Sequence, residues 1–439
     1  MNQSPDFIED KPAPTFFEHP LHKFASLSKS ILEYEESLAK RAKLNPKLVY
    51  KYLNNKLNVK SIIYSLINEN RIITNDRYEI ASLLNKYFNS VYSRSDHIES
   101  DNNDFDTQNT KKCLFDIDKI VTLKIILEYL NNVNTNKAMG VDGISPYFLK
   151  QTSKSVSYPL FLIIKKSFGS GEIPDFWRLA NVSPVHKQGN RSDPKNYRPI
   201  SLTSLPCRIA EKIIRDLIIN FLTENELINP KQHGFIPQKS YFLTYHLSLG
   251  KQIDILFTDF SKAFDRVNHK KLLRKLKKIG IDELLLKWIE SFLKNRKQRV
   301  ILGDVESDWL DIFSGVPQGS VLGPLLFVIF INYLPDTLKN HCLLYADDCV
   351  IDPNNQCQSV SKLQEDIDCL IEWCKESSMD LNFNKCELIS VSTRDSLEHN
   401  YIMRNPISGE IYTIPRTKLQ KDLIKSDLNW HSRVCSAAS

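Results

Sequence analysis

The sequence predicts an α+β fold, and three kinds of pattern in its 439 residues support this prediction. Apolar side chains recur at helical spacing over residues 80–88, directly after residues 74–75, either of which can cap a helix. Residues 253–258 alternate between apolar and polar side chains, which is typical of a strand. Two short apolar runs, residues 343–345 and 349–351, flank an Asp-bearing tight turn and predict a pair of strands.

The elements between these segments follow from the same signals. A second helical stretch is expected near residues 120–130, and turn residues become dense from about Lys137 onward. Directly after the first predicted strand, residues 270–279 place apolar side chains on one face and basic side chains elsewhere. This pattern predicts a helix that ends at Gly280.

The composition is that of a globular protein, with 42% hydrophobic and 25% charged residues. The longest apolar stretch, residues 321–331, is too short to cross a bilayer, so no membrane partner is expected. The first 20 residues lack the apolar core of a signal peptide, which indicates an intracellular protein whose nine cysteines stay reduced. Cys369, Cys374 and Cys386 lie near one another in the sequence, but no fourth ligand stands at a suitable spacing for zinc.

An acidic stretch divides the chain. Residues 95–112 are rich in Asp and Asn and predict an exposed linker, which follows a helical N-terminal region of residues 1–94. No glycine precedes Gly140, so the N-terminal third cannot hold a glycine-rich phosphate-binding loop. The rest of the chain is expected to form a main domain of residues 113–395 and a short C-terminal segment of residues 396–439.

Positive charge is concentrated in one segment. The whole chain has 58 basic and 52 acidic residues, a net charge of +6, whereas residues 262–299 contain 13 basic and four acidic residues. A basic stripe of this kind indicates a polyanionic partner. The alternative interpretation is a solvated helix face.

Carboxylates provide the candidate chemistry. Asp347 and Asp348 are adjacent at the predicted turn, and Asp259 ends the predicted strand at residues 253–258. If these strands pair, all three acids converge at one sheet edge, where their oxygens suit Mg²⁺ or Mn²⁺. Two such ions would support phosphoryl transfer. The alternative is that the Asp pair only serves the turn, since turns favour Asp.

The order of several short motifs resembles that of a reverse transcriptase. Three segments resemble successive palm motifs, namely residues 258–265 (TDFSKAFD), 314–320 (SGVPQGS) and 345–348 (YADD). Four more resemble motifs of non-LTR (LINE-type, jockey-like) retrotransposon enzymes. Two are similar to the fingers motifs, namely residues 196–202 (NYRPISL) and 232–235 (QHGF). Residues 137–144 (KAMGVDGI) are similar to the N-terminal extension motif, and residues 382–386 (NFNKC) to the closing palm motif. The resemblance runs from about residue 44 to residue 430.

This resemblance implies a right-hand polymerase, with fingers and palm made of an antiparallel sheet and packed helices in residues 113–395. It implies an RNA-directed DNA polymerase that uses an RNA template, a DNA primer and deoxynucleoside triphosphates. Enzymes of such transposable elements act on chromosomal DNA, which makes nuclear action plausible. Residues 396–439 are too few for a full thumb, so the thumb is expected to be largely absent.

The same resemblance implies the role of each predicted site residue. Asp259, Asp347 and Asp348 are expected to hold two Mg²⁺ ions, or Mn²⁺, at the catalytic centre. The predicted nucleotide-binding residues are Lys187 and Arg198 at the triphosphate, Phe264 against the sugar, Gln318 beneath the template and nucleotide pair, and Lys385 at the leaving pyrophosphate. The alternatives are a core position for Phe264, a turn for Gln318 and a surface loop for the two triphosphate residues.

Departures from the family pattern predict an eroded scaffold. Only 18 residues lie between Ser240 and Asp259, about two helical turns fewer than in relatives. Residues 421–428 lack the Leu-Gly step of the primer grip, and neither an endonuclease before residue 44 nor a ribonuclease H segment is expected. The chain is therefore expected to be a truncated fragment, and the alternative function is a catalytically dead remnant that binds nucleic acid.

Overall fold

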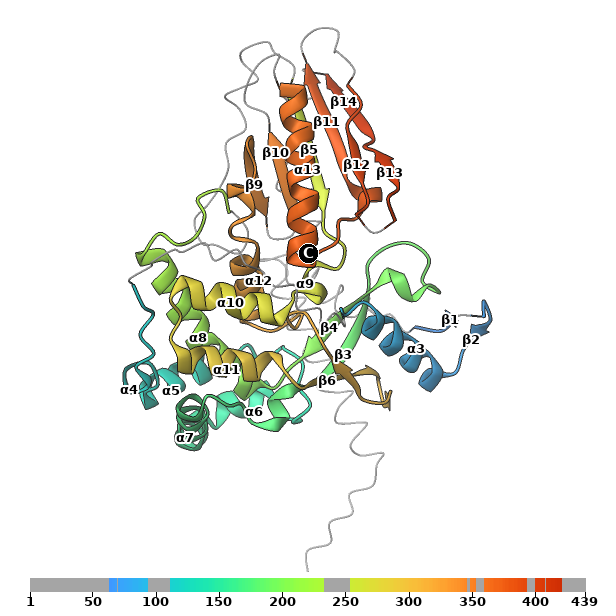
Figure 1. Cartoon of the computed structure of the whole chain (residues 1–439). Coiled ribbons are helices and arrows are strands. Elements are labelled where there is room, and N and C mark those ends of the chain that lie inside the picture. Colours follow the sequence, from blue (N-terminus) through green and yellow to red (C-terminus); the bar gives the residue numbers. More distant parts are fainter. Residues whose placement is uncertain are drawn as a thin grey trace, which may run out of the picture. The chain divides into compact units, whose positions relative to one another are not determined.

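A five-stranded sheet in the order β14-β11-β5-β10-β9 forms the upper part of the molecule in Figure 1. Its strands are β5 (Ile253–Asp259), β9 (His341–Tyr345), β10 (Asp348–Asp352), β11 (Glu387–Ser392) and β14 (Arg416–Gln420). The first four pair antiparallel, as predicted, whereas β14 runs parallel to β11. The hairpin of β12 (Ile402–Arg404) and β13 (Ile411–Thr413) lies in the connection from β11 to β14 along the chain.

The computed structural model describes residues 63–68, 70–93, 111–232, 253–345, 348–352, 359–392, 399–406 and 408–420. The chain divides into two units, Met1–Tyr64 and Ser65–Ser439, and the elements below belong to the second. Nearly all of the predicted acidic linker, residues 241–252 of the short interval after Ser240 and the predicted gap at residues 421–428 lie outside the described residues. No helix in the described part of the chain is long and apolar enough to span a membrane.

Helices cover one face of this sheet. Alternate residues of β5 point to opposite faces, and Leu256 belongs to the core that also contains Ile351 of β10 and Leu388 of β11. The helices packed on this core are α12 (Gly323–Ile331) and α13 (Ser359–Ser377), and Figure 1 shows α13 running along the sheet. Because α12 is apolar on all sides, it can only be a buried helix.

A second sheet has the order β4-β3-β6-β7, with β8 paired to β6. Its strands are β3 (Leu179–His186), β4 (Tyr197–Leu202), β6 (Arg296–Leu302), β7 (Val305–Glu306) and β8 (Leu310–Ile312). Strands β3 and β4 form an antiparallel hairpin, and β6 joins β3 in parallel. Sheets and helices mix along the described part of the chain, which confirms the predicted α+β class.

Further helices of the described residues pack largely on one another. They are α4 (Ile117–Ile120), α5 (Leu123–Asn131), α6 (Pro146–Gln151), α7 (Ser153–Ser170), α8 (Leu205–Glu224), α9 (Ala263–Arg266), α10 (His269–Ile279) and α11 (Glu283–Leu293). Helices α5 and α10 confirm the predicted helices near residues 120–130 and 270–279. As predicted, α10 ends at Gly280, where φ is 103° and a Cβ atom would lie 2.4 Å from the carbonyl oxygen of Lys111.

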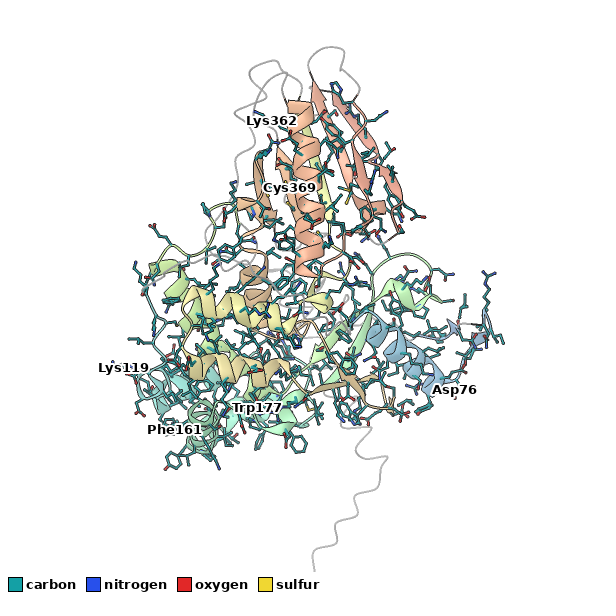
Figure 2. The ribbon with its side chains drawn as sticks, in the orientation of Figure 1. Asp76, Lys119, Phe161, Trp177, Lys362 and Cys369 are labelled. Atoms are coloured by element: carbon teal, nitrogen blue, oxygen red, sulfur yellow. The ribbon has the colours of Figure 1, made fainter. Side chains whose placement is uncertain are left out.

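The N-terminal helix α3 (Arg77–Ser90) follows a small hairpin of β1 (Leu66–Ile67) and β2 (Ile73–Thr74). The helix was predicted, but its predicted cap at residues 74–75 is wrong. Asp76, labelled in Figure 2, is the N-cap, because its carboxylate accepts a hydrogen bond from the backbone N–H of Glu79 at 2.7 Å. Thr74 instead donates its hydroxyl hydrogen to the Glu79 carboxylate, at 2.5 Å.

A buried carboxylate ties the C-terminal strands to the sheet. Asp254 of β5 is 7% exposed and accepts hydrogen bonds from the hydroxyls of Ser390 at 2.6 Å and Tyr401 at 3.2 Å. Arg416 at the start of β14 forms an ion pair with the same carboxylate at 3.4 Å. Asp254 therefore joins β5, β11 and β14 through its side chain.

We predict that Asp254→Ala lowers the free energy of unfolding by about 3–5 kcal/mol, because the Arg416 side chain, which is only 14% exposed, loses its counterion. Urea unfolding of the two proteins measures this change. As a control, Asp304→Ala removes an ion pair with Arg77 whose aspartate is 81% exposed, and should cost less than about 0.5 kcal/mol. Equal effects of the two substitutions would contradict the structural role of Asp254.

Candidate active site

The pairing of β5 with β10 brings two of the predicted catalytic positions together. Asp348 lies directly opposite Asp259 in the antiparallel register, and Cys349 lies opposite Thr258. On its other side β10 pairs with β9, so that Asp348 is opposite Tyr345, which confirms the predicted strands around the turn. Asp347 lies outside the described residues. Positions 259 and 348 thus share one face of the sheet, opposite to the face of Leu256 that α12 and α13 cover.

The Asp259 carboxylate is held by the segment that follows α13. The ammonium of Lys385 lies 3.0 Å from its Oδ2 atom, and the Asn382 side-chain amide donates a hydrogen bond to the same oxygen at 3.2 Å. The backbone N–H of Asn382 also donates to the Asp259 carbonyl oxygen at 2.8 Å. The Asp259 side chain remains 25% exposed. No role was predicted for Asn382 from the sequence. The available signal was its place at the start of the segment NFNKC, which resembles a palm motif.

The donor chemistry at this sheet edge fits a hard divalent cation. Carboxylate oxygens are the preferred ligands of Mg²⁺ and Mn²⁺, and the register places a second carboxylate position directly opposite Asp259. Within the part of the chain that the structure describes, no three His, Cys, Asp or Glu side chains form a group that could hold a metal ion. The side chain of Asp259 is the described member of the predicted triad.

Phe264 lies on α9, close after the end of β5. Its ring stacks on Phe327 of α12, with ring centroids 4.6 Å apart and an angle of 22° between the planes. The ring is half-buried and packs against the core rather than within it. Packing against Phe327 therefore fixes one side of the ring, and its contact with a sugar stays a prediction.

Gln318 does lie in a turn, but its side chain makes a specific contact. Its Nε2 atom donates hydrogen bonds to both carboxylate oxygens of Asp265, at 2.8 and 2.9 Å. Asp265 is 3% exposed, and this burial raises the pKa of its carboxyl group to about 6, while the Gln318 hydrogen bond and the charges of Lys262 and Arg266 lower it. The sequence alone predicted no role for Asp265, although this residue ends the segment TDFSKAFD.

Backbone contacts fix the loop that carries Gln318. The hydroxyl of Ser314 donates to the Asp265 carbonyl oxygen at 2.7 Å, and the Gly315 N–H donates to the carbonyl oxygen of Val267 at 2.8 Å. On the other side the Ser201 N–H of β4 donates to the Gln318 carbonyl oxygen at 2.8 Å. The loop of residues 314–320 is therefore clamped between the segment after β5 and the β3–β4 hairpin.

A buried glutamate holds the C-terminal side of this loop. Glu211 of α8 is fully buried, and its Oε2 atom accepts hydrogen bonds from the backbone N–H groups of Val321 at 2.7 Å and Leu322 at 3.0 Å. Burial raises the pKa of Glu211, and these two N–H groups oppose the rise. No sequence motif identified Glu211, because its partners lie 110 and 111 residues further along the chain.

Lys187 and Arg198 both lie on the β3–β4 hairpin. Arg198 is half-buried in β4, opposite Val185, and Lys187 is exposed just beyond the end of β3. The backbone N–H of Lys187 donates to the Asn196 carbonyl oxygen at 2.8 Å. The structure thus places the two residues on one hairpin, whose strand β4 contacts the Gln318 loop through Ser201. Their contact with a triphosphate stays a prediction.

Two lysines of the basic stripe at residues 262–299 have a structural role. Lys271 of α10 donates to the carbonyl oxygen of Glu376 in α13, and Lys275 donates to the carbonyl oxygen of Phe330 in α12 at 2.5 Å. Both lysines therefore satisfy carbonyl groups in the last turn of neighbouring helices, where positive charge is favourable. The exposed basic residues of α10 are Lys270, Arg274 and Lys277.

Paired acidic positions on adjacent strands suit metal-assisted phosphoryl transfer, and the comparison with known protein families agrees with this chemistry. The family model described as "Reverse transcriptase (RNA-dependent DNA polymerase)" matches residues 185–411, which is more than half of the chain. The chain therefore belongs to the reverse transcriptase family.

Individual relatives confirm the predicted resemblance to non-LTR retrotransposon enzymes. The chain is 29% identical to "Probable RNA-directed DNA polymerase from transposon BS" of Drosophila melanogaster over 61% of this chain and 32% of the relative. It is 28% identical to "RNA-directed DNA polymerase from mobile element jockey" of the same species over 62% and 32%, respectively. It is 26% identical to "Probable RNA-directed DNA polymerase from transposon X-element", also of that species, over 59% and 30%. The chain thus spans about a third of the length of these relatives.

We predict that Gly315→Ala lowers the free energy of unfolding by about 1–3 kcal/mol. Gly315 has φ = 84°, and an added Cβ atom would lie 2.6 Å from the Asp265 carbonyl oxygen. Gly169→Ala is the matched control, because an added Cβ in α7 meets nothing within 4 Å and should raise stability by about 0.5–1 kcal/mol. Thermal unfolding measures both changes, and shifts of the same sign would be inconsistent with the clamped loop.

Proposed function

We propose that this chain is the RNA-directed DNA polymerase domain of a non-LTR retrotransposon and that it performs two-metal nucleotidyl transfer. The observation that carries the proposal is the register of Asp259 opposite Asp348 in a chain of the reverse transcriptase family. In this assignment β5, β9, β10 and β11 belong to the palm and the β3–β4 hairpin to the fingers, within residues 113–395. Residues 1–94 form an N-terminal extension, residues 95–112 a linker and residues 396–439 the C-terminal part.

The reaction joins a deoxynucleotide to a DNA primer along an RNA template. The 3′-hydroxyl oxygen of the primer attacks the α-phosphorus and loses its proton to solvent water, and a new P–O bond forms. The bond from that phosphorus to the oxygen bridging the α- and β-phosphates breaks, and pyrophosphate leaves with the electron pair. Mg²⁺ ions held by Asp259, Asp347 and Asp348 would activate the hydroxyl and stabilise the leaving oxygen.

Side chains around this centre would bind and orient the nucleotide. Lys187 and Arg198 share one hairpin, from which two cations can grip the triphosphate. The Phe264 ring, fixed against Phe327, would press on the sugar and exclude a 2′-hydroxyl. Lys385 lies 3.0 Å from Asp259, so its ammonium is close enough to the reacting centre to neutralise charge on the pyrophosphate.

The template and primer would supply the polyanionic partner that the basic segment indicates. Lys270, Arg274 and Lys277 of α10 are exposed, unlike Lys271 and Lys275, which cap neighbouring helices. Phosphate contacts with these three residues would make nucleic-acid affinity fall as salt rises.

Primer extension on an RNA template with Mg²⁺ tests the proposal. Asp259→Asn is expected to lower the rate of incorporation more than about 100-fold, because one charge at the metal site is lost. Asp347→Asn should lower the rate of incorporation by a similar factor. Asp311→Asn, which removes an exposed charge paired with Lys297 at 3.6 Å, serves as the control and should retain the rate. Salt-dependent binding of the template without extension would refute catalysis and leave the nucleic-acid-binding alternative.

Phe264→Val should weaken discrimination against ribonucleotides, because a smaller side chain leaves room for the 2′-hydroxyl. The ratio of kcat/KM for a deoxynucleotide to that for the matching ribonucleotide is expected to fall at least about tenfold. Phe327→Leu, which alters only the support of the ring, is the comparison variant and should change this ratio less. An unchanged ratio in Phe264→Val would remove the proposed sugar contact.

A further inference from the structure

We propose that Asp265 is a positioning residue of this site, whose carboxylate sets the orientation of the Gln318 side-chain amide. The inference rests on the function proposed above, because Gln318 is assigned there to the template and nucleotide pair. It adds a residue that neither the sequence motifs nor the family comparison assigned. Its basis is the set of contacts that join Asp265 to the loop of residues 314–320 and to Tyr92 and Ser93, which follow α3.

The contact between the two side chains has one favourable orientation. Gln318 Nε2 lies 2.8 Å from one oxygen of Asp265 and 2.9 Å from the other. An ionised carboxylate only accepts hydrogen bonds, so the NH₂ group must face Asp265. A rotated amide would set its carbonyl oxygen against two negatively charged oxygens. The side-chain amide oxygen of Gln318 is therefore directed away from Asp265.

Asp265 is itself fixed by backbone contacts. Its N–H group donates to the Lys262 carbonyl oxygen at 3.0 Å, and its carbonyl oxygen accepts the Ser314 hydroxyl at 2.7 Å. The same Ser314 hydroxyl oxygen accepts the backbone N–H of Ser93 at 2.8 Å. A chain of hydrogen bonds thus connects Ser93, which follows α3, to Asp265, which orients Gln318.

The polar and titratable neighbours of Asp265 come from three parts of the chain. Lys262 and Arg266 flank it in its own segment and favour the ionised carboxylate. Tyr92 of the N-terminal segment is the titratable neighbour on the second side, and the Asp265 charge helps to raise the pKa of its phenol. On the loop side the neighbours are the neutral Gln318 and the Gly315 carbonyl oxygen, which is hydrogen-bonded to His269 at 2.7 Å. Burial lowers the pKa of His269.

The orientation should respond to pH. Burial raises the pKa of Asp265 to about 6, so below that pH the carboxyl group carries a proton. A protonated carboxyl donates one hydrogen bond, which the rotated Gln318 amide can accept. The unfolded carboxyl gains its proton only near pH 4, so the folded state binds more protons between pH 6 and 4. Protonation of Asp265 therefore raises the free energy of unfolding as pH falls through that interval. A loss of activity between pH 6 and 4 would then not be caused by a loss of stability due to Asp265.

Nuclear magnetic resonance of the full chain with ¹⁵N-labelled glutamine tests the contact without requiring catalysis. The Gln318 side-chain amide signal is identified by its absence in Gln318→Ala. We expect this signal to shift with a midpoint near pH 6 in the native chain and to lose that titration in Asp265→Asn. A Gln318 signal that ignores both pH and Asp265→Asn would overturn the proposal.

Primer extension between pH 5 and 8 supplies the functional readout. Asp265→Asn should raise KM for the nucleotide about tenfold at pH 7.5, and its KM should vary less below pH 6 than that of the native chain. The control is Asp366→Asn, which changes another buried carboxylate that accepts backbone N–H groups of Lys339 and Asn340. Identical pH profiles of KM in the two variants would show that Asp265 has only a structural role.

A double substitution separates the contact from the charge. In Asp265→Asn with Gln318→Glu, the amide donates and the carboxylate accepts, so the pair is re-formed with reversed polarity. We expect the unfolding temperature to recover but KM to remain raised, because the group at position 318 is now reversed. Recovery of both would contradict an orienting role. If the native chain extends no primer, the proposed function fails, and the resonance titration still decides the contact.

Discussion

The antiparallel register between β5 and β10 is the constraint on which the site depends. Because side chains alternate between the two faces of a strand, a slip of one residue would move Asp348 to the face that α12 and α13 cover. The slip would also bring Cys349 and Ile351 out of the core. Burial of apolar side chains on one face of the sheet therefore aligns the acidic positions on the other.

The sequence predicted the elements whose signals are local. Alternation over residues 253–258 marked β5, and apolar spacing with Gly280 marked α10 and its end. The cap of α3 was missed because Thr74 and Asp76 are both capping residue types, and only the backbone decides which carboxylate or hydroxyl reaches the Glu79 N–H. The parallel pairing of β14 with β11 was also not predicted, since pairing between distant strands leaves no local pattern.

Motifs located the candidate site, but not the contacts that hold it. Asp259, Gln318 and Lys385 were all named from the sequence, whereas Asn382 and Glu211 were found only once the fold had brought them to their partners. The basic run shows the same limit in a different way. Charge along a helix does not distinguish a lysine that faces solvent from one, such as Lys275, that caps a neighbouring helix.

The docking of α3 has a consequence for the order in which this chain can fold. Asn85 of α3 donates a hydrogen bond to Ser307, which is 222 residues further along the chain. At a synthesis rate of about 5–20 residues per second, some 10–40 seconds pass before the partner strands of α3 leave the ribosome. During that delay the apolar face of α3, which includes Ile80, Leu84 and Phe88, has no strand to cover it. We therefore expect this face of α3 to stay uncovered until the strands that pack against it have been synthesised.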